Sequence, residues 1–371
     1  MSGYRCIHIA GTNGKGSTAH YLANILKAAG KRCGLFTSPH LLKWQERIQI
    51  DGENIDMPDD FETTLYEGGY FINTAKLAYE VFEQAGLDYA IIETGIGGKK
   101  DITMMFEADI AVITTIGLDH ADILGKTIDS IADQKAGIIR KNNRVYSHPQ
   151  KMRAAGIIRD QAFKMRADLK ELKKKQISHI RHDEDTILFD FSYQGKEYRD
   201  IKLSSIAEIQ TQNAAVAFMV ALDEGIDERA IRAGLLLPVM GRTEVFEDRI
   251  VLDVSHNEDS LKALKATIKN QFPKQHVTMM FAAQKTKDIK KMAPVINSFV
   301  DAIYLVELDD KRFYLPKDIS RLFKNPKYLS GKGGALQSSF RYVEHIARNG
   351  ILVVCGSFVL TGRVYPFISS V

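Results

Sequence analysis

The chain has 371 residues, of which 45% are hydrophobic and 26% charged, and its formal net charge is +4. This length exceeds the roughly 250–300 residues at which a single hydrophobic core usually stops growing, so two domains are expected. The composition is that of an ordinary globular protein, and no apolar run reaches the roughly 18 residues needed to cross a bilayer, which argues against a membrane role.

The start of the chain and its cysteines indicate the compartment. The segment MSGYRC runs straight into an apolar stretch and leaves no room for a signal peptide, so we expect a cytoplasmic protein. Cys6, Cys33 and Cys355 are odd in number and scattered along the chain. We therefore expect buried thiols in preference to disulfides or a metal cluster.

Strand-like and helical segments alternate through the first part of the chain. The expected strands cover residues 5–10, 32–38, 88–94, 109–116 and 143–148, with helices from Ser17 and over residues 71–86. This alternation predicts a mostly parallel sheet covered by helices, with ligands at the carboxyl ends of its strands. The basic run from Lys170 to Lys175 is interpreted as a solvated helix face, because it lacks the interleaved aromatic residues of a nucleic-acid-binding segment. Residues 185–203 predict a hairpin on the first domain, with its turn at Gln194 and Gly195.

A second alternating series begins after Pro238 and Gly241, which interrupt both periodicities. Its expected strands cover residues 249–255, 276–283, 301–307 and 350–358, and its expected helices run from Glu258 to Phe272 and from Asp288 to Val300. The chain is therefore predicted to divide near Met240 into domains of residues 1–240 and 241–371.

A glycine-rich loop separates the first strand from the first helix. It contains Gly11, Thr12, Asn13, Gly14, Lys15, Gly16 and Ser17. Such a loop directs backbone N–H groups and the helix dipole at one point, where phosphate binds, and Lys15 adds a cation for the terminal phosphates. The loop departs from the commonest phosphate-loop motif, GxxxxGK[ST], at two positions. Ala10 replaces the first glycine, and Gly16 separates Lys15 from Ser17. A glycine-rich turn with an incidental lysine is the alternative, but it does not explain the strand and helix on either side.

The spelling AGTNGKGS is typical of the Mur ligase superfamily, and within it the chain resembles the folylpolyglutamate synthase and dihydrofolate synthase family. Further segments match in the family's order: TSPHL (37–41), ERIQIDGENI (46–55), IIETGIGGKKD (91–101), residues 114–139, TQNAAVAF (211–218), GRTEV (241–245), LDVSHN (252–257), KTKD (285–288) and GSFVLTGRV near the end. The resemblance implies an ATP-binding, Mur-ligase-like central domain with a phosphate loop and a parallel sheet, followed by a smaller Rossmann-like α/β ligase domain.

The resemblance also implies the reaction and its cofactors. Such enzymes phosphorylate a carboxylate with ATP and let an amine attack the acyl phosphate, here adding L-glutamate to a folate or to dihydropteroate, with two Mg²⁺ ions. By resemblance, Ser38 and Glu93 would hold the ATP-linked ion, and His120 would help to hold a second. Lys135 would be carbamylated and assist that second ion. Its burial among Ile131, Ile138 and Ile139 would favour the neutral amine that carbamylation requires.

In the second half of the chain, Asn213 begins a helix that resembles the family's adenine-contacting segment. Arg242 takes the GR position and would bridge phosphates, while Asp253 and His256 follow a strand where the family contacts ribose and the incoming amino acid. Without the resemblance, a helix cap for Asn213 and a surface salt bridge for Arg242 would be equally good interpretations.

Two segments depart from the family's usual sequence motifs. Residues 99–104 stand in place of RLDATN, and Val254, Ser255 and Glu258 change the usual DGAHNP. Because Glu258 puts a negative charge beside the expected amino-acid site, another acid and amino acid remain an alternative pair of substrates. A nucleotide-binding homologue without catalysis is a further alternative. The expected partners are small molecules only, with neither nucleic acid nor membrane, and the expected state is a monomer.

Overall fold

The computed structural model describes residues 3–57, 69–183 and 185–368, and the chain divides into two compact units. Unit 1 comprises Met1–Ser204 with Ile209–Val239, and unit 2 comprises Ser205–Glu208 with Met240–Val371. Each unit has its own sheet and its own hydrophobic core.

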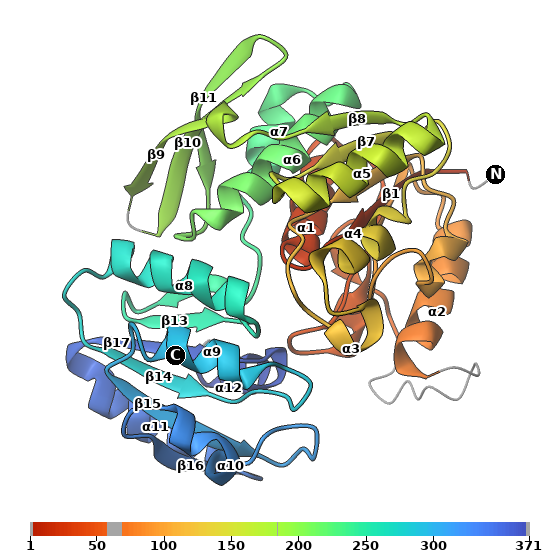
Figure 1. Cartoon of the computed structure of the whole chain (residues 1–371). Helices are drawn as coiled ribbons and strands as arrows, with labels where there is room; N and C mark the ends of the chain where they lie inside the picture. Colours follow the sequence, from red (N-terminus) through yellow and green to blue (C-terminus); the bar gives the residue numbers. More distant parts are fainter. Residues whose placement is uncertain (1–2, 58–68, 184, 369–371) are drawn as a thin grey trace. The chain divides into compact units, whose positions relative to one another are not determined.

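Unit 1 is built on an eight-stranded sheet with the order β4-β3-β2-β5-β1-β6-β7-β8 (Figure 1). The strands are β1 (Arg5–Ala10), β2 (Cys33–Phe36), β3 (Ile48–Ile50), β4 (Glu53–Asn54), β5 (Tyr89–Glu93), β6 (Ile110–Ile113), β7 (Arg144–Ser147) and β8 (Asp168–Glu171). The strands from β2 to β8 in this order pair in parallel, whereas β3 and β4 extend the β2 edge in antiparallel fashion. The predicted mostly parallel sheet is confirmed, and the carboxyl ends of its central strands share one edge.

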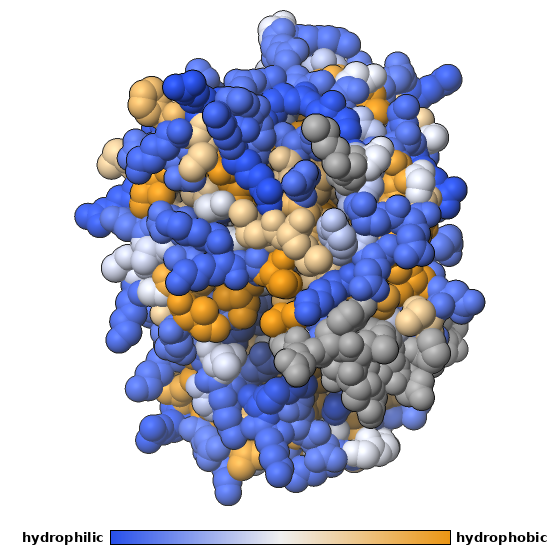
Figure 2. Space-filling model, turned by 90° about the vertical axis from the view of Figure 1, so that its right-hand side faces the viewer, coloured by the Kyte–Doolittle hydropathy of each residue, from blue (hydrophilic) through white to orange (hydrophobic). Residues whose placement is uncertain are grey.

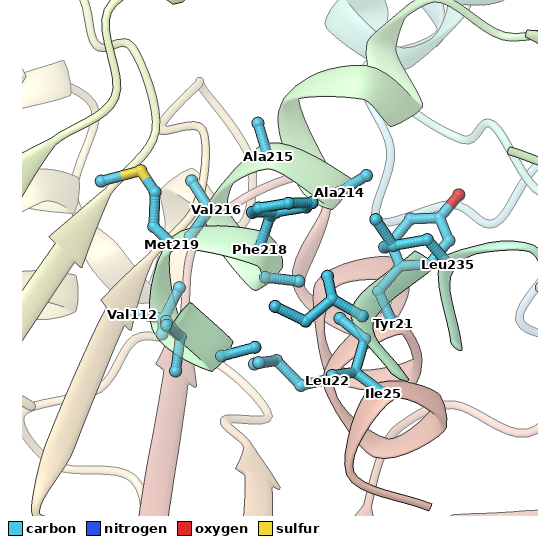
Figure 3. Packing of buried hydrophobic residues seen from close by; sticks show 14 of the residues in the cluster. Tyr21, Leu22, Ile25, Val112, Ala214, Ala215, Val216, Phe218, Met219 and Leu235 are labelled. Atoms are coloured by element: carbon cyan, nitrogen blue, oxygen red, sulfur yellow. The ribbon is translucent and has the colours of Figure 1, made fainter. Parts of the chain in front are cut away.

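Helices cover both faces of this sheet because its strands are apolar on both sides. The helices are α1 (Lys15–Ala28), α2 (Tyr70–Gln84), α3 (Ala121–Leu124), α4 (Ile128–Ala136), α5 (Met152–Met165), α6 (Ile209–Asp223) and α7 (Glu228–Leu235). Ile7 and Ile9 of β1 pack in one cluster with α1 and α6, whose buried side chains Figure 3 shows. Cys6 and Ala10 belong to clusters on the opposite face, which include side chains of α2, α4 and α5. This alternation is the period of two that a strand imposes on its side chains.

The predicted hairpin is confirmed. Strands β10 (Thr186–Tyr193) and β11 (Lys196–Leu203) pair around Gln194 and Gly195, which both have positive φ as a tight hairpin turn requires. Strand β9 (Ile177–Asp183) completes a three-stranded antiparallel sheet. Phe189 and Phe191 lie in the same cluster as α6, so the hairpin is attached to the core of unit 1.

The basic run is not a helix face, and this prediction was wrong. Residues 168–171 form β8, and only Lys174–Gln176 make a short 3-10 helix. The reason is non-local, because β8 adds to the free edge of β7 with Val145 opposite Leu169. Lys170 points to Asp223, with 2.6 Å between its Nζ and the carboxylate Oδ2.

Asp223 joins separate parts of unit 1 at the end of α6. Its side chain is 7% exposed, and it accepts hydrogen bonds from Tyr146, Lys170, Tyr193 and Gln194. Burial alone would raise the pKa of Asp223, but the hydrogen bonds from Lys170, Tyr146 and Tyr193 outweigh it and hold the pKa below its ordinary value. The sheet, the hairpin and α6 are thereby tied through one carboxylate.

Asp223→Ala is expected to lower the free energy of unfolding of unit 1 by about 3 kcal/mol, because it leaves a lysine and two tyrosine hydroxyls without their acceptor. The pKa of Asp223 is lowered in the folded state. Its contribution to the free energy of unfolding is therefore fully present above the unfolded-state pKa of about 4, and it is lost as pH falls through the folded-state pKa. Fluorescence of Trp44, the single tryptophan, during urea unfolding measures the change. Asp168→Ala is the matched control, since Asp168 also faces Lys170 but is 64% exposed. Equal losses in both variants would contradict the role of Asp223.

Unit 2 has a six-stranded sheet with the order β12-β13-β17-β14-β15-β16, in which only β12 is antiparallel. Its strands are β12 (Arg242–Phe246), β13 (Ile250–Asp253), β14 (Val277–Phe281), β15 (Ala302–Leu308), β16 (Lys327–Gly331) and β17 (Ile351–Cys355). Its helices are α8 (Glu258–Gln271), α9 (Ile289–Ile296), α10 (Pro316–Ile319), α11 (Ala335–Ile346) and α12 (Phe358–Ile368). Alternate residues of the central strands pack in two clusters, one with α8 and α9 and the other with α11 and α12. The second α/β series is therefore confirmed.

One helix of unit 2 is shorter than predicted. Helix α9 ends at Ile296, whereas the periodicity extended to Val300. The side chain of Asn297 bonds to the carbonyl of Leu322 and to the amide of Lys324, at 2.8 and 3.2 Å. These distant partners fix the chain in a turn after the helix.

The state of the cysteines and the character of the surface agree with what the composition predicts. Cys6, Cys33 and Cys355 are free and buried, as predicted. None of the described helices combines the length and apolarity that a membrane crossing requires. Figure 2 shows one face, on which hydrophobic residues form patches within a mainly hydrophilic surface. Exposed apolar side chains include Leu42, Ile96 and Leu118, in loops that follow β2, β5 and β6, and Ile123 in α3, which also follows β6.

Candidate active site

The glycine-rich loop lies at the carboxyl end of β1 and leads directly into α1, as predicted. Helix α1 begins at Lys15, and Gly14 before it has φ of 94°, a conformation that favours glycine. No acidic residue occupies the first turn of α1, so its exposed N–H groups keep the positive end of the helix dipole. This arrangement suits a phosphate group.

Two glycines of this loop have no room for a side chain. A Cβ atom at Gly11 would lie 1.8 Å from Oγ1 of Thr114, which follows β6. A Cβ atom at Gly14 would lie 2.4 Å from Oδ1 of Asn213. Close packing on both sides fixes the path of the loop, and any larger residue would displace it.

Hydrogen bonds join the phosphate loop to the loop after β6. The amides of Thr12 and Asn13 donate to the carbonyl of Thr115, at 2.9 and 3.3 Å. The hydroxyl of Thr12 donates to the carbonyl of Gly117 and accepts from its amide, each at 3.0 Å. Gln150 supports the second loop by accepting from the amide of Ile116. These bonds could not be predicted from the sequence, because single threonine and glutamine residues carry no periodic or motif signal.

Lys15, Glu93 and Ser38 come together at the shared edge of the sheet. Glu93 is the last residue of β5, which pairs with β1, and its side chain is 4% exposed. Its Oε1 lies 3.6 Å from Nζ of Lys15, and its Oε2 accepts from the amide of Ser38 at 3.0 Å. A buried carboxylate therefore lies beside the phosphate loop and next to Ser38, the second residue after β2.

Lys135 reaches the same loop from α4. It is 5% exposed, and its Nζ donates to the carbonyl of Gly11 at 2.6 Å. Its expected apolar neighbours Ile131, Ile138 and Ile139 are all buried. Burial, and then the charge of Lys15, lower the pKa of Lys135 to about 7, against the opposing effect of Asp119 and Asp101. Burial therefore favours the neutral amine of this lysine, and the alternative of a lysine reaching into solvent is excluded.

His120 lies in the loop that the phosphate loop binds. It precedes α3 with φ of 50°, and its side chain is 35% exposed. Its Nε2 is 3.9 Å from Oδ2 of Asp119. The structure thus places His120 on the β6 side of the site and Glu93 on the β5 side.

The donors present suit a metal ion that is bound largely by phosphate. Across residues 3–57, 69–183 and 185–368, no three or more His, Cys, Asp and Glu side chains group as a complete metal site. Glu93 offers one buried carboxylate beside the loop. Mg²⁺ takes hard oxygen ligands and usually keeps several waters or phosphate oxygens, so a single carboxylate with few other protein ligands fits it.

Asn213 lies beside the phosphate loop, but it does not begin a helix as predicted. Helix α6 begins one turn earlier, at Ile209, so Asn213 is not a helix cap. Its side chain is buried, its Nδ2 donates to Oε1 of Gln210 at 2.8 Å, and its Oδ1 packs on Gly14. Its amide is therefore held against the loop by the helix itself.

The predicted residues of unit 2 gather at one end of β13. Arg242 pairs in register with Asp253, the last residue of that strand, and its guanidinium lies 5.1 Å from the ring centroid of Phe358. The carboxylate of Asp253 accepts from the hydroxyl of Thr243 and from the amide of Ser255, both at 2.7 Å. His256 follows the strand, with Nδ1 2.8 Å from the carbonyl of Val254.

The charge of Glu258 is paired. Glu258 begins α8, and its Oε1 lies 2.6 Å from Nζ of Lys262, one turn along the helix. This ion pair offsets the negative charge that the sequence analysis expected to repel a glutamate substrate. The spacing of four residues between Glu258 and Lys262 could have revealed the pair.

Family models match most of the chain. The Mur ligase middle domain matches residues 9–221, and the Mur ligase glutamate ligase domain matches residues 241–358. A dihydrofolate synthase/folylpolyglutamate synthase of Bacillus subtilis is 32% identical over 347 residues, which are 85% of this chain and 79% of the relative. The chain belongs to the folylpolyglutamate synthase/dihydrofolate synthase family. The predicted resemblance is thereby confirmed.

Solved structures of this family share the fold. Folylpolyglutamate synthase of Mycobacterium tuberculosis, complexed with ADP and AMPPCP, has a TM-score of 0.88 at 25% identity and covers 99% of this chain and 91% of its own. Escherichia coli FolC in complex with DHPP and ADP has a TM-score of 0.86 at 28% identity, with 99% and 89% covered. This member of the family is therefore an ATP-dependent ligase with the two-domain α/β Mur ligase fold.

Proposed function

We propose that this ligase joins L-glutamate to a folate or to dihydropteroate through an acyl phosphate, releasing ADP and phosphate. The observation that carries the proposal is the pairing of Lys15 with the buried Glu93 beside the phosphate loop. The relatives' names and the DHPP complex of Escherichia coli FolC support the folate substrate. Exposed apolar side chains after β2, β5 and β6 suit the aromatic part of such an acid.

The residues of unit 1 serve the phosphoryl transfer. A carboxylate oxygen of the acid forms a bond to the γ-phosphorus, and the bond from that phosphorus to ADP breaks. The loop amides and Lys15 neutralise the charge that collects on the transferring group, which is the main contribution a protein makes to this step. In the second step the amine of glutamate attacks the acyl carbon, phosphate leaves, and the amine loses a proton. Gly11, Thr12, Asn13, Gly14, Gly16 and Ser17 would bind the phosphates.

Magnesium fits the donors at this edge. Glu93 and Ser38 would hold the ion that accompanies ATP, and His120 would help to hold a second. The ions would supply positive charge at the phosphate oxygens. Lys135 as an ammonium cannot be a ligand, so we propose that it is carbamylated. Its neutral Nζ would attack carbon dioxide and lose a proton, which turns a buried cation into a carboxylate-like anion.

The remaining residues receive roles by position. We assign residues 1–240 to ATP binding and residues 241–371 to the amino-acid ligase domain. Asn213, buried against Gly14, would contact the adenine, and Arg242 would bridge phosphates with its rigid donor fork. Asp253 and His256 at the end of β13 would contact ribose and the incoming amino acid. The protein is expected to act as a monomer in the cytoplasm.

Release of ADP and phosphate is expected only when ATP, L-glutamate and a folate acid are all present. A coupled assay of ADP release, with chromatography of the product, measures this across dihydropteroate, tetrahydrofolate and their amides. Omission of either glutamate or the acid should abolish release. Turnover with a different acid and none with any folate would overturn the substrate, whereas ATP binding without turnover in any mixture would overturn the catalytic role.

A further inference from the structure

The segment ERIQIDGENI contains an arginine that the proposed chemistry does not use. Arg47 is the last residue of the 3-10 helix η1 (Trp44–Arg47), and its carbonyl accepts from the amide of Thr37 at 3.0 Å. Because β2 and β3 are antiparallel with Phe36 opposite Ile48, this contact places Arg47 at the carboxyl end of β2. Ser38, which bonds to Glu93, is the residue after Thr37.

The guanidinium of Arg47 is held from two sides. Its Nε donates to Nδ1 of His40 at 2.9 Å, and its Cζ lies 4.9 Å from the ring centroid of Tyr70. Tyr70 begins α2, whose next residue, Phe71, packs so closely on Gly95 that a Cβ there would lie 2.5 Å from the ring. Gly95 comes two residues after the end of β5. Arg47 therefore lies at the edge of the sheet that carries Glu93.

The two terminal nitrogens of Arg47 make no hydrogen bond within the part of the chain that the structure describes, although the residue is only 8% exposed. Burial lowers the pKa of Arg47, and the nearby groups of Tyr70, Glu93 and Glu46 act against this. A guanidinium nevertheless stays charged at neutral pH. Neither terminal nitrogen is among the fully buried polar atoms that lack a partner, so an anion arriving from solvent can reach both of them.

The phosphates of ATP are already supplied with donors by the loop after β1 and by Lys15. In the sheet, β5 lies between β2 and β1, so a spacing of about 4.8 Å per strand puts the end of β2 roughly 10 Å from that loop. A second substrate that approaches the terminal phosphate of ATP would lie at about this distance from the loop. The free pair of nitrogens on a planar guanidinium matches a carboxylate in bidentate geometry.

We infer that Arg47 binds the carboxylate of the acid substrate and presents one of its oxygens to the γ-phosphoryl group, an inference that rests on the proposed function. In the reaction that oxygen bonds to phosphorus and the bond from phosphorus to ADP breaks, while Arg47 keeps its protons throughout. His40 and Tyr70 fix the guanidinium plane and are positioning residues.

The test compares Arg47→Gln and Arg47→Lys with the wild type, using dihydropteroate, which carries one carboxylate, and its carboxamide. Arg47→Gln is expected to raise KM for dihydropteroate by about 100-fold and to leave KM for ATP within about threefold, since one charged contact is lost. Arg47→Lys should recover part of the loss because it restores the charge without the fork. In calorimetry with AMPPCP present, the wild type should prefer the carboxylate to the carboxamide, and Arg47→Gln should lose this preference.

Arg144→Gln is the matched control. Arg144 begins β7, the strand next to β8 on the far side of the same sheet, and pairs with Glu224, so its loss should lower the melting temperature and leave both KM values unchanged. The inference is overturned if Arg47→Gln keeps the preference for the carboxylate, or if it raises both KM values together, which is the result of a merely structural role. Failure of the wild type to bind or convert any folate acid is a different outcome, which removes the proposed function and this inference with it.

Discussion

Replacement of Lys15 with alanine is expected to lower kcat/KM for ATP-dependent amide formation by about 10³-fold, the effect of removing one pre-positioned cation from a transferring phosphoryl group. Lys15 is the first residue of α1 and lies 3.6 Å from Glu93, so it is fixed between the loop and the buried carboxylate. The variant also leaves that carboxylate without its neighbouring cation. Steady-state ADP release at saturating acid and glutamate measures the effect.

Lys27→Ala is the control for the Lys15 variant. Lys27 lies in the last turn of the same helix, and its side chain is 48% exposed and 4.0 Å from Glu53. Its replacement should leave kcat/KM within about twofold, because exposed ion pairs contribute little. Amide formation by Lys15→Ala at more than a tenth of the wild-type rate would contradict the assignment of the loop.

Replacement of Lys135 with methionine is expected to reduce the rate by a similar factor and to remove any response to carbon dioxide. The methionine fills the apolar surroundings but cannot be carbamylated. A short carboxylate such as acetate should partly restore the rate of this variant by occupying the space of the carbamate. In the wild type, mass spectrometry or carbon-13 NMR should detect the carbamate directly.

The pKa of Lys135, about 7, sets the pH dependence. Because it is lowered, the neutral amine predominates above pH 7, so at fixed dissolved carbon dioxide the carbamate and the activity should both fall as pH drops from 8 to 6. Lys99→Met is the matched control, since Lys99 packs on Gly137 just after α4 but is 55% exposed beside Asp133. A bare amine at Lys135 in an active, Mg²⁺-bound enzyme would reject carbamylation.

Local sequence was sufficient to predict the phosphate loop and the positions of the central strands along the chain. The glycines at positions 11 and 14 stand out in the sequence, although the contacts that require them come from Thr114 and Asn213, and the apolar strand before them is buried on both faces. The burial of Lys135 was also foreseeable, because isoleucines recur around it at helical spacing.

Non-local pairing limited the rest of the prediction. Lys170 belongs to a strand only because the edge of β7 is available, and a run of lysines alone carries no sign of that partner. The four groups that meet at Asp223 come from three separate parts of the sequence, at Tyr146, at Lys170 and at the neighbours Tyr193 and Gln194, so no motif or period connects them. Arg47 was noticed as part of a motif, but its open nitrogens become visible only once His40 and Tyr70 are in place.

The paired hydrogen bonds between Thr12 and Gly117 couple the phosphate loop to the loop that carries His120, so that the two move together. A ligand that stiffens the first must stiffen the second, even where it makes no contact there. The exchange of the Gly117 amide with solvent deuterium is therefore expected to slow when nucleotide binds. This measurement needs neither a substrate analogue nor a spectroscopic label.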